Sequence, residues 1–202
     1  MHAAWTEVAG TGGESLAAFD DVVGRHREQH RRYHGVRHVT WVVRHVHDLA
    51  GSVEVTDLGA VTMAAFFHDA VYDPRAGDNE RQSAALAARV LGELGWEGDR
   101  THAVTVLIEA TAGHAATDEP DRAVLLDADL AVLGSEPSAY QAYVTGVRVE
   151  YAHVDSESWS VGRAAVLRSY LDRERLYSTE EARNRWEARA RANMTAELMS
   201  LR

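Results

Sequence analysis

Apolar residues recur along this chain mainly at the three- and four-residue spacing of amphipathic helices, while the alternating runs typical of strands are scarce. The spacing predicts helices over residues 14–32, 38–50, 57–70, 79–94, 99–112, 121–133, 138–153, 159–172 and 179–200. The three prolines, at positions 74, 120 and 137, fall between these segments, where they break no helix. We therefore expect an all-α fold.

Several predicted helix starts carry a side chain that suits the position. Asp57 and Asp78 can cap the helices that follow them, because a carboxylate oxygen accepts hydrogen bonds from the free N–H groups of a first turn. Thr179 precedes Glu180 and Glu181, whose negative charges favour a helix N-terminus. These residues support the boundaries predicted from the hydrophobic spacing.

The chain contains no internal repeat, low-complexity tract or linker, so we expect one helical domain over residues 1–202. The last helix, within "RNRWEARARANMTAELM", has two candidate positions. It could pack on the outside of this domain or on a partner chain in a homodimer.

Composition removes several classes of function. The formal net charge is −10 and all 21 basic residues are arginine, so neither a nucleic-acid partner nor lysine chemistry is expected. The chain has no cysteine, which excludes disulfides and thiolate metal sites. No apolar run approaches the roughly 20 residues that span a bilayer, and no signal segment is recognised. We therefore expect a cytoplasmic protein without a membrane partner.

A histidine and an aspartate end the most apolar segment, "GAVTMAAFFHD" at 59–69. The segment is apolar almost all round, which indicates a helix buried on most faces. An unpaired carboxylate at Asp69 would be costly there. A divalent cation removes the conflict, because it binds neutral imidazole and carboxylate together. The alternative is a His68–Asp69 hydrogen bond that only fixes the helix end.

The same dipeptide occurs at His47–Asp48, and it provides an internal comparison. In this segment the apolar residues form a single stripe, made of Val39, Val42, Val43, Val46 and Leu49. His47 falls on the polar side of the predicted helix, so we expect a solvated pair that binds no metal.

Further metal ligands are expected from two other segments. His38 begins the helix predicted at 38–50, and His34 lies four residues earlier in "RRYHGVRHV". Asp127 and Asp129 lie in the apolar stretch "AVLLDADLAVLG". Positions two apart on a helix are separated by about 200° of rotation, so only one of these aspartates can face the site.

The order His38, His68–Asp69, Asp129 resembles the metal-ligand pattern of the HD superfamily of metal-dependent phosphohydrolases. The flanking sequences resemble an uncharacterised branch of predicted HD phosphohydrolases, and the likeness covers most of residues 31–197. It implies a helical domain with its metal core at roughly 31–134 and the helices of 138–200 packed on that core. It also selects Asp129, and not Asp127, as the fourth ligand.

The resemblance extends to two candidate catalytic residues. "YHGVRH" is similar to the "YHN-x-x-H" stretch of cyclic-nucleotide phosphodiesterases, which implies that His34 is the proton donor. Gly35 stands where that pattern has asparagine, and the alternative is a surface histidine or one that only supports the ligands. Asp73 aligns with one acid of a pair that serves the attacking water in related hydrolases, whereas Tyr72 replaces the other acid.

A phosphorylated substrate also needs positive charge, and two arginines are candidates for binding it. Arg148 borders a predicted apolar stripe on the helix at 138–153, and Arg37 is adjacent to His38. Arg148 could equally form a structural ion pair. His114 is a single candidate for a second metal site, in the region where two-metal relatives recruit extra histidines.

The resemblance therefore implies a phosphohydrolase that acts on a small phosphate ester or nucleotide. Its cofactor would be one divalent metal ion (Mn, Mg, Zn, Ni, Co or Fe), which activates a water molecule. Two alternatives remain open. One is a di-iron oxygenase of the HD type, which would need more histidine ligands. The other is a non-catalytic nucleotide-binding sensor, which would bind its ligand without turnover.

Overall fold

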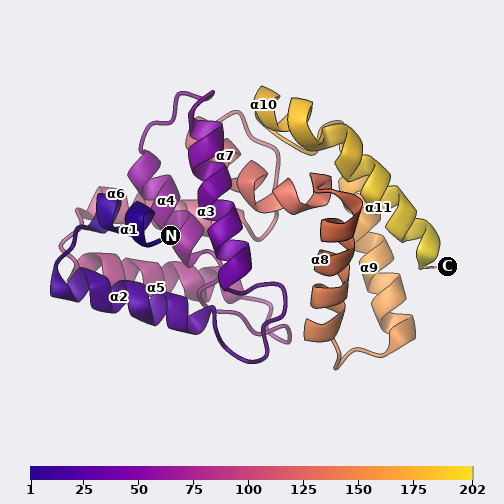
Figure 1. Ribbon diagram of the computed structural model, residues 1–202, viewed down its shortest axis with the longest axis horizontal. Coiled ribbons are helices and arrows are strands. Elements are labelled where there is room, and N and C mark those ends of the chain that lie inside the picture. Colours follow the sequence, from indigo (N-terminus) through magenta and orange to yellow (C-terminus); the bar gives the residue numbers. More distant parts are fainter. Residues whose placement is uncertain (202) are drawn as a thin grey trace.

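The computed structural model describes residues 1–201, and all the regular elements in this range are helical. Three helices form the centre of the molecule (Figure 1): α3 (Val36–Ala50), α4 (Leu58–Phe67) and α7 (Pro120–Leu130). Helix α4 contacts both of the others, and every one of its residues from Ala60 onward is buried. This burial is what an all-round apolar helix requires.

The remaining helices cover two sides of this centre. Figure 1 shows α1 (His2–Ala9), α2 (Gly13–Arg25), α5 (Asn79–Glu93) and α6 (Gly98–Ala110) on one side. On the other side lie the short helix η1 (Ala131–Gly134), α8 (Pro137–Glu150), α9 (Ser156–Leu171), α10 (Glu180–Ala182), the π-helical turn η2 (Arg183–Glu187) and α11 (Ala188–Ser200). The all-α prediction is confirmed.

The hydrophobic pattern correctly placed the long helices but missed one element and overextended another. Helix α1 was not predicted; it is held by Trp5, which is fully buried and donates from its indole Nε1 to Ser15. The helix predicted at 14–32 ends at Arg25, and the chain continues as a loop to Gly35. That loop carries His34, so its departure from the helix is what brings this residue to the candidate site.

The predicted helix caps had different outcomes. Asp57 caps α4 by accepting a hydrogen bond from the Ala60 N–H at 2.9 Å, and Thr179 accepts one from the Ala182 N–H at 3.2 Å. The prediction for Asp78 was wrong. Its carboxylate accepts from the side chains of Arg81 and Gln82 instead, and makes no cap hydrogen bond. Two long donors one turn away therefore compete successfully for this carboxylate.

The last helix packs on this same chain. Helix α11 contacts α9 and η1, and its Glu197 forms a buried ion pair with Arg163 of α9 at 2.7 Å. Where η2 crosses η1, a side chain at Gly134 would overlap with the backbone of Trp186, so this close approach requires glycine. Of the two candidate positions for the last helix, the structure shows it on the outside of its own domain.

None of the helices within residues 1–201 combines the length and the apolar character needed to cross a membrane.

One buried histidine of this fold should make stability depend on pH. His26 follows α2, is 2 % exposed and donates from Nε2 to the Phe66 carbonyl at 3.1 Å. Burial lowers its pKa to about 4. The folded protein therefore takes up this proton only below pH 4, whereas the unfolded chain takes it up near pH 6.5. The contribution of His26 alone to the free energy of unfolding should fall by roughly 3 kcal/mol as the pH drops from 7 to 4.

Urea unfolding at several pH values measures this loss. His26→Gln keeps a donor for the Phe66 carbonyl but cannot titrate, so its stability should depend less steeply on pH. The exposed His102 provides the matched control, because His102→Gln should keep the wild-type slope. Equal slopes for the wild type and His26→Gln would contradict the assignment.

Candidate metal centre

Two imidazoles and two carboxylates from three helices converge at one point. His38 Nε2 lies 3.1 Å from His68 Nε2, 3.3 Å from Asp69 Oδ2 and 3.2 Å from Asp129 Oδ1. His68 Nε2 lies 3.2 Å from Asp69 Oδ2 and 3.6 Å from Asp129 Oδ1. His38, His68 and Asp69 form a group whose ligand atoms could hold a metal ion, and Asp129 adjoins both imidazoles of that group.

Each ligand candidate is positioned by the burial of its helix. His38 lies in the first turn of α3, one turn before Val42, and so shares the buried face of that helix. His68 and Asp69 follow the last residue of α4, which the surrounding core fixes on all sides. Asp129 is near the end of α7, between buried Ala128 and Leu130. The apolar stripes therefore dictate that the four side chains meet.

The hydrogen bonding of His68 indicates that a positive charge belongs between these groups. Its Nδ1–H donates to the Ala65 carbonyl at 2.9 Å. In the neutral ring, Nε2 then carries a lone pair, yet it faces carboxylate oxygens of Asp69 and Asp129. A lone pair against a carboxylate is repulsive unless a cation or a proton lies between them. A histidine with one nitrogen on a backbone carbonyl and the other free is a common arrangement of metal ligands.

The pKa values reflect the same need for charge compensation. Burial lowers the pKa of His68, but the charges of Asp69 and Asp129 outweigh it and raise that pKa well above its usual value. Burial also raises the pKa of Asp69 and of Asp129, but the neighbouring His68 lowers both well below the usual value. The carboxylates are therefore ionised at neutral pH, and a divalent cation fits this donor set of two imidazoles and two carboxylates.

The structure separates Asp127 from Asp129 as the helical geometry requires. Asp127 is buried on the other face of α7, where it accepts from the backbone N–H groups of Ser178 and Thr179 at 2.8 and 2.7 Å. It therefore ties the start of α10 to α7. Of the two aspartates, only Asp129 lies with His38 and His68.

The second His-Asp dipeptide lies away from this centre, but His47 is not solvated as expected. His47 is half-buried, and its Nε2 lies 3.2 Å from the hydroxyl of buried Thr62. A neighbouring face of α4 thus provides a partner that the single apolar stripe of α3 did not reveal.

His47→Ala should leave metal affinity unchanged and destabilise the protein by about 1–3 kcal/mol, because it leaves the Thr62 hydroxyl buried without a partner. Metal titration and urea unfolding measure the two effects separately. Loss of the metal in this variant would show that His47 acts on the metal centre.

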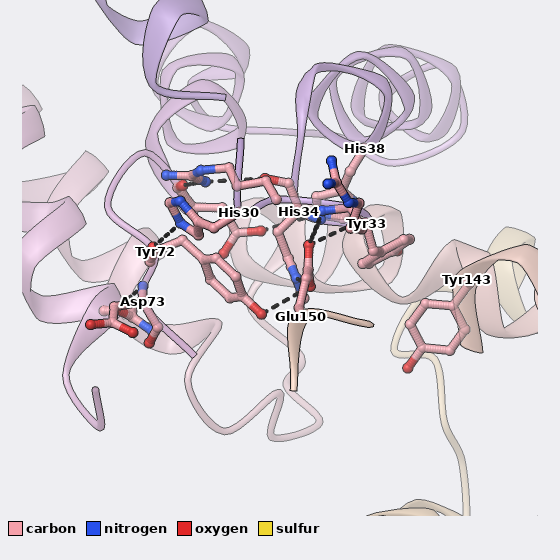
Figure 2. A network of polar contacts seen from close by, with 12 residues as sticks. His30, Tyr33, His34, His38, Tyr72, Asp73, Tyr143 and Glu150 are labelled. Carbon is pink, nitrogen blue, oxygen red and sulfur yellow. Dashed lines mark hydrogen bonds and ion pairs between the residues drawn. The ribbon is translucent and has the colours of Figure 1, made fainter. Parts of the chain in front are cut away.

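Beside the metal centre, His34 is held by a carboxylate from the other half of the chain (Figure 2). Glu150 Oε1 accepts from the N–H groups of Arg32, Tyr33 and His34 at 2.6, 2.7 and 3.0 Å. Its Oε2 accepts from His34 Nδ1 at 2.7 Å and from the Tyr72 hydroxyl at 3.0 Å. Glu150 therefore fixes both the loop and the ring of His34.

The surroundings of Glu150 keep its carboxylate ionised. Burial would raise its pKa, but the hydrogen bond and charge of His34 and the N–H groups of the loop lower it to about 2. Because the ionised carboxylate can only accept, Nδ1 of His34 must carry a proton. The Nε2 atom is left as the ring nitrogen available to the cleft.

His34, Asp69 and Asp129 all line one cleft of about 350 Å³. The cleft is also lined by His114 and Glu80, and by no arginine among the residues described. His114 Nε2 lies 2.7 Å from Asp129 Oδ2, so this histidine joins the cluster from the segment after α6. Its φ of 44° is unusual for a residue other than glycine, and Arg173 donates to its carbonyl.

Three of the predicted site residues lie elsewhere. Asp73 is exposed and accepts from the Arg75 N–H at 2.9 Å, so it closes the turn at Pro74 and does not line the cleft. Arg148 donates to the carbonyls of Tyr151 and Val154 at 2.8 and 3.1 Å, which is a structural role at the end of α8. Arg37 borders a different cavity, beside His38.

Glu150 was not predicted as part of the site. It lies more than a hundred positions from His34, and no local pattern distinguishes it from the other acidic residues of the chain. The one available signal was its place on the helix predicted at 138–153, next to Tyr151 at the end of the apolar stripe of that helix. A buried carboxylate there needs partners, but the sequence does not say which.

Comparison of the chain with known protein families, with curated proteins and with solved structures gave no match.

Proposed function

We propose that this protein is a metal-dependent phosphohydrolase of the HD type, acting on a small phosphate ester or nucleotide. The observation that carries the proposal is the convergence of His38, His68, Asp69 and Asp129, of which the two aspartates line an open cleft. A purely structural His–Asp hydrogen bond would not need a second imidazole and a second carboxylate at the same point.

The four converging side chains would hold the cation. When bound there, a divalent cation would lower the pKa of a water molecule and polarise a phosphoryl oxygen of the substrate. The cleft lining includes Asp69, Glu80 and Asp129 but no arginine within residues 1–201. A phosphate would be repelled by these carboxylates, so substrate affinity should depend on the cation and on the two histidines of the cleft.

His34 would act on the leaving group. Hydrolysis breaks the bond between phosphorus and the leaving oxygen; the hydroxyl of water stays on phosphorus and a proton is added to the leaving oxygen. His34 would donate that proton from Nε2, since Glu150 accepts the hydrogen bond from Nδ1. The attacking water loses its second proton to the solvent of the open cleft, and the His34 ring regains a proton from that solvent. Glu150 stabilises the protonated ring and keeps it oriented.

Phosphate release from a panel of nucleotides and phosphate esters tests this proposal. The protein should be assayed saturated with Mn²⁺ and again after chelation, with Asp69→Asn as the matched variant. We expect turnover of at least one phosphorylated compound, which chelation and Asp69→Asn both abolish. Turnover that persists after both changes, or its absence across the panel at full metal occupancy, would contradict a metal-dependent phosphohydrolase.

A second candidate is an oxidising enzyme with two irons. It is favoured by one observation, the approach of His114 Nε2 to within 2.7 Å of Asp129 Oδ2. This contact offers a further imidazole beside a carboxylate that could bridge two ions. Metal analysis separates the candidates, because an oxidising enzyme should retain two redox-active irons per chain.

A further inference from the structure

A second cavity, of about 160 Å³, borders His38 but shares no lining residue with the metal cleft. It lies between the start of α3 and the segment from η1 to α8, and Tyr33 and His38 form one of its walls. Figure 2 shows Tyr33 and Tyr143 on the side of Glu150 away from Tyr72. A ligand in this cavity would therefore adjoin His38 and lie outside the cleft.

The cavity differs from the cleft in the sign of its charge. Its lining includes Arg32 and Arg37 and no carboxylate among the residues described, in a chain whose net charge is −10. Within residues 1–201 neither guanidinium has an ion pair or a side-chain hydrogen bond, whereas Arg31 and Arg163 are both fully engaged. Two unpaired guanidiniums at one cavity favour an anionic group.

The walls of the cavity favour a flat ring. Tyr33, Trp41 and Tyr143 line it together with small alanines of α8, and the Tyr33 and Tyr143 rings meet edge to face with their centroids 4.7 Å apart. Aromatic walls of this kind pack well against a planar ligand. A cavity of about 150 Å³ is known to hold a benzene molecule, so the volume suits a single six-membered ring.

Two of the residues that line the cavity also carry a polar atom whose hydrogen-bonding capacity is unused. Trp41 Nε1 and Ser135 Oγ are both buried and lack a hydrogen-bond partner among the described residues. Ser135 as a whole is 8 % exposed. Buried polar atoms are rarely left unpaired in proteins, and both of these belong to residues that border the cavity.

We propose that this cavity is a second binding site, which takes a small planar anion consisting of one aromatic ring that carries a carboxylate or a phosphate-type group. The ring lies against Trp41 and Tyr143, and the anionic group lies between Arg32 and Arg37. The site is independent of the metal and of the phosphohydrolase activity proposed above.

Binding of benzoate and phenylphosphonate to the ¹⁵N-labelled full chain, saturated with Mg²⁺, tests the proposal. The indole N–H signal of Trp41, assigned with Trp41→Phe, should shift saturably with a dissociation constant of roughly 1 mM. A response to benzoate identifies a carboxylate ligand and a response to phenylphosphonate a phosphate-type ligand; either supports the site. Inorganic phosphate and benzyl alcohol, which carry only the charge or only the ring, should bind more weakly. No saturable shift with either ring anion would overturn the proposal.

Three variants locate the bound probe. Arg37→Gln should weaken binding about 10-fold, and Ala142→Phe, at an exposed position on the cavity rim, should block it. Arg168→Gln removes the same charge from an exposed position on α9 and should have no effect. Asp129→Asn should also leave binding unchanged. If Arg37→Gln and Ala142→Phe both bound the probe as tightly as the wild type, or if Asp129→Asn lost binding, the probe would lie elsewhere and the proposal would be overturned.

Discussion

Asp129→Ala should abolish tight binding of a divalent cation, whereas Asp127→Asn should leave the affinity nearly unchanged. Asp129 Oδ1 lies 3.2 Å from His38 Nε2, within the converging cluster, so its removal deletes a ligand and a compensating charge. Changes to residues that only support ligands cost 10–100-fold in metal affinity. Loss of a ligand should therefore exceed about 100-fold. Calorimetric titration of the metal-free protein with Mn²⁺ measures the difference.

Asp127 is the matched control because it is a buried aspartate of the same helix, two positions before Asp129. Its carboxylate accepts two backbone N–H groups, so Asp127→Asn should reduce stability by about 1–3 kcal/mol without affecting the metal. Urea unfolding separates this loss from any change in affinity. If Asp127→Asn lost the metal and Asp129→Ala retained it, the ligand face of α7 would be wrongly assigned.

His34→Ala should lower kcat by about 10²–10⁴-fold while the metal stays bound. The reason is position: His34 lines the cleft, but its Nδ1 is engaged by Glu150 and it is not among the four candidate metal ligands. His30 lies on the same loop and donates to the Tyr72 carbonyl outside the cleft. The kcat of His30→Ala should therefore stay within a few-fold of the wild-type value. Steady-state kinetics at full metal occupancy measures both variants.

Glu150→Gln tests the orienting carboxylate without changing its size. The amide can still accept from the loop, but it cannot stabilise a protonated His34, so kcat should fall while KM and metal affinity stay close to the wild type. A variant that loses kcat and metal affinity together would indicate that Glu150 only holds the fold. Unchanged kcat in both His34→Ala and Glu150→Gln would exclude His34 as the proton donor.

Three of the four candidate ligands could be predicted from sequence because the burial of their helices positions them. The all-round apolar character of α4 places His68 and Asp69 in the core, and the stripe of α3 does the same for His38. For these three residues the information is local, within one turn or one helix. The 200° between Asp127 and Asp129 required a choice between them, which only the resemblance to the HD superfamily made, and the structure places Asp129 with the imidazoles.

The residues around the ligands could not be predicted in this way. Glu150 reaches His34 through a tertiary contact between α8 and a loop, which no periodicity encodes. Asp73 was expected at the site because it aligns with an acid of related hydrolases, and Arg148 because it borders an apolar stripe, but each finds partners within a few residues. A polar side chain in a turn or at a helix end is usually used locally. Neither an aligned position nor a place beside an apolar stripe therefore establishes a role at the site.

We propose that His38, His68, Asp69 and Asp129 together bind one divalent cation. Crystals of the protein grown with Mn²⁺ allow the ion to be located by anomalous diffraction. We expect one strong peak at this cluster, with direct ligand distances near 2.0–2.3 Å. The proposal would be wrong if the only fully occupied Mn²⁺ peak lay elsewhere on the chain, or if no peak appeared at the cluster while the four side chains kept their present arrangement.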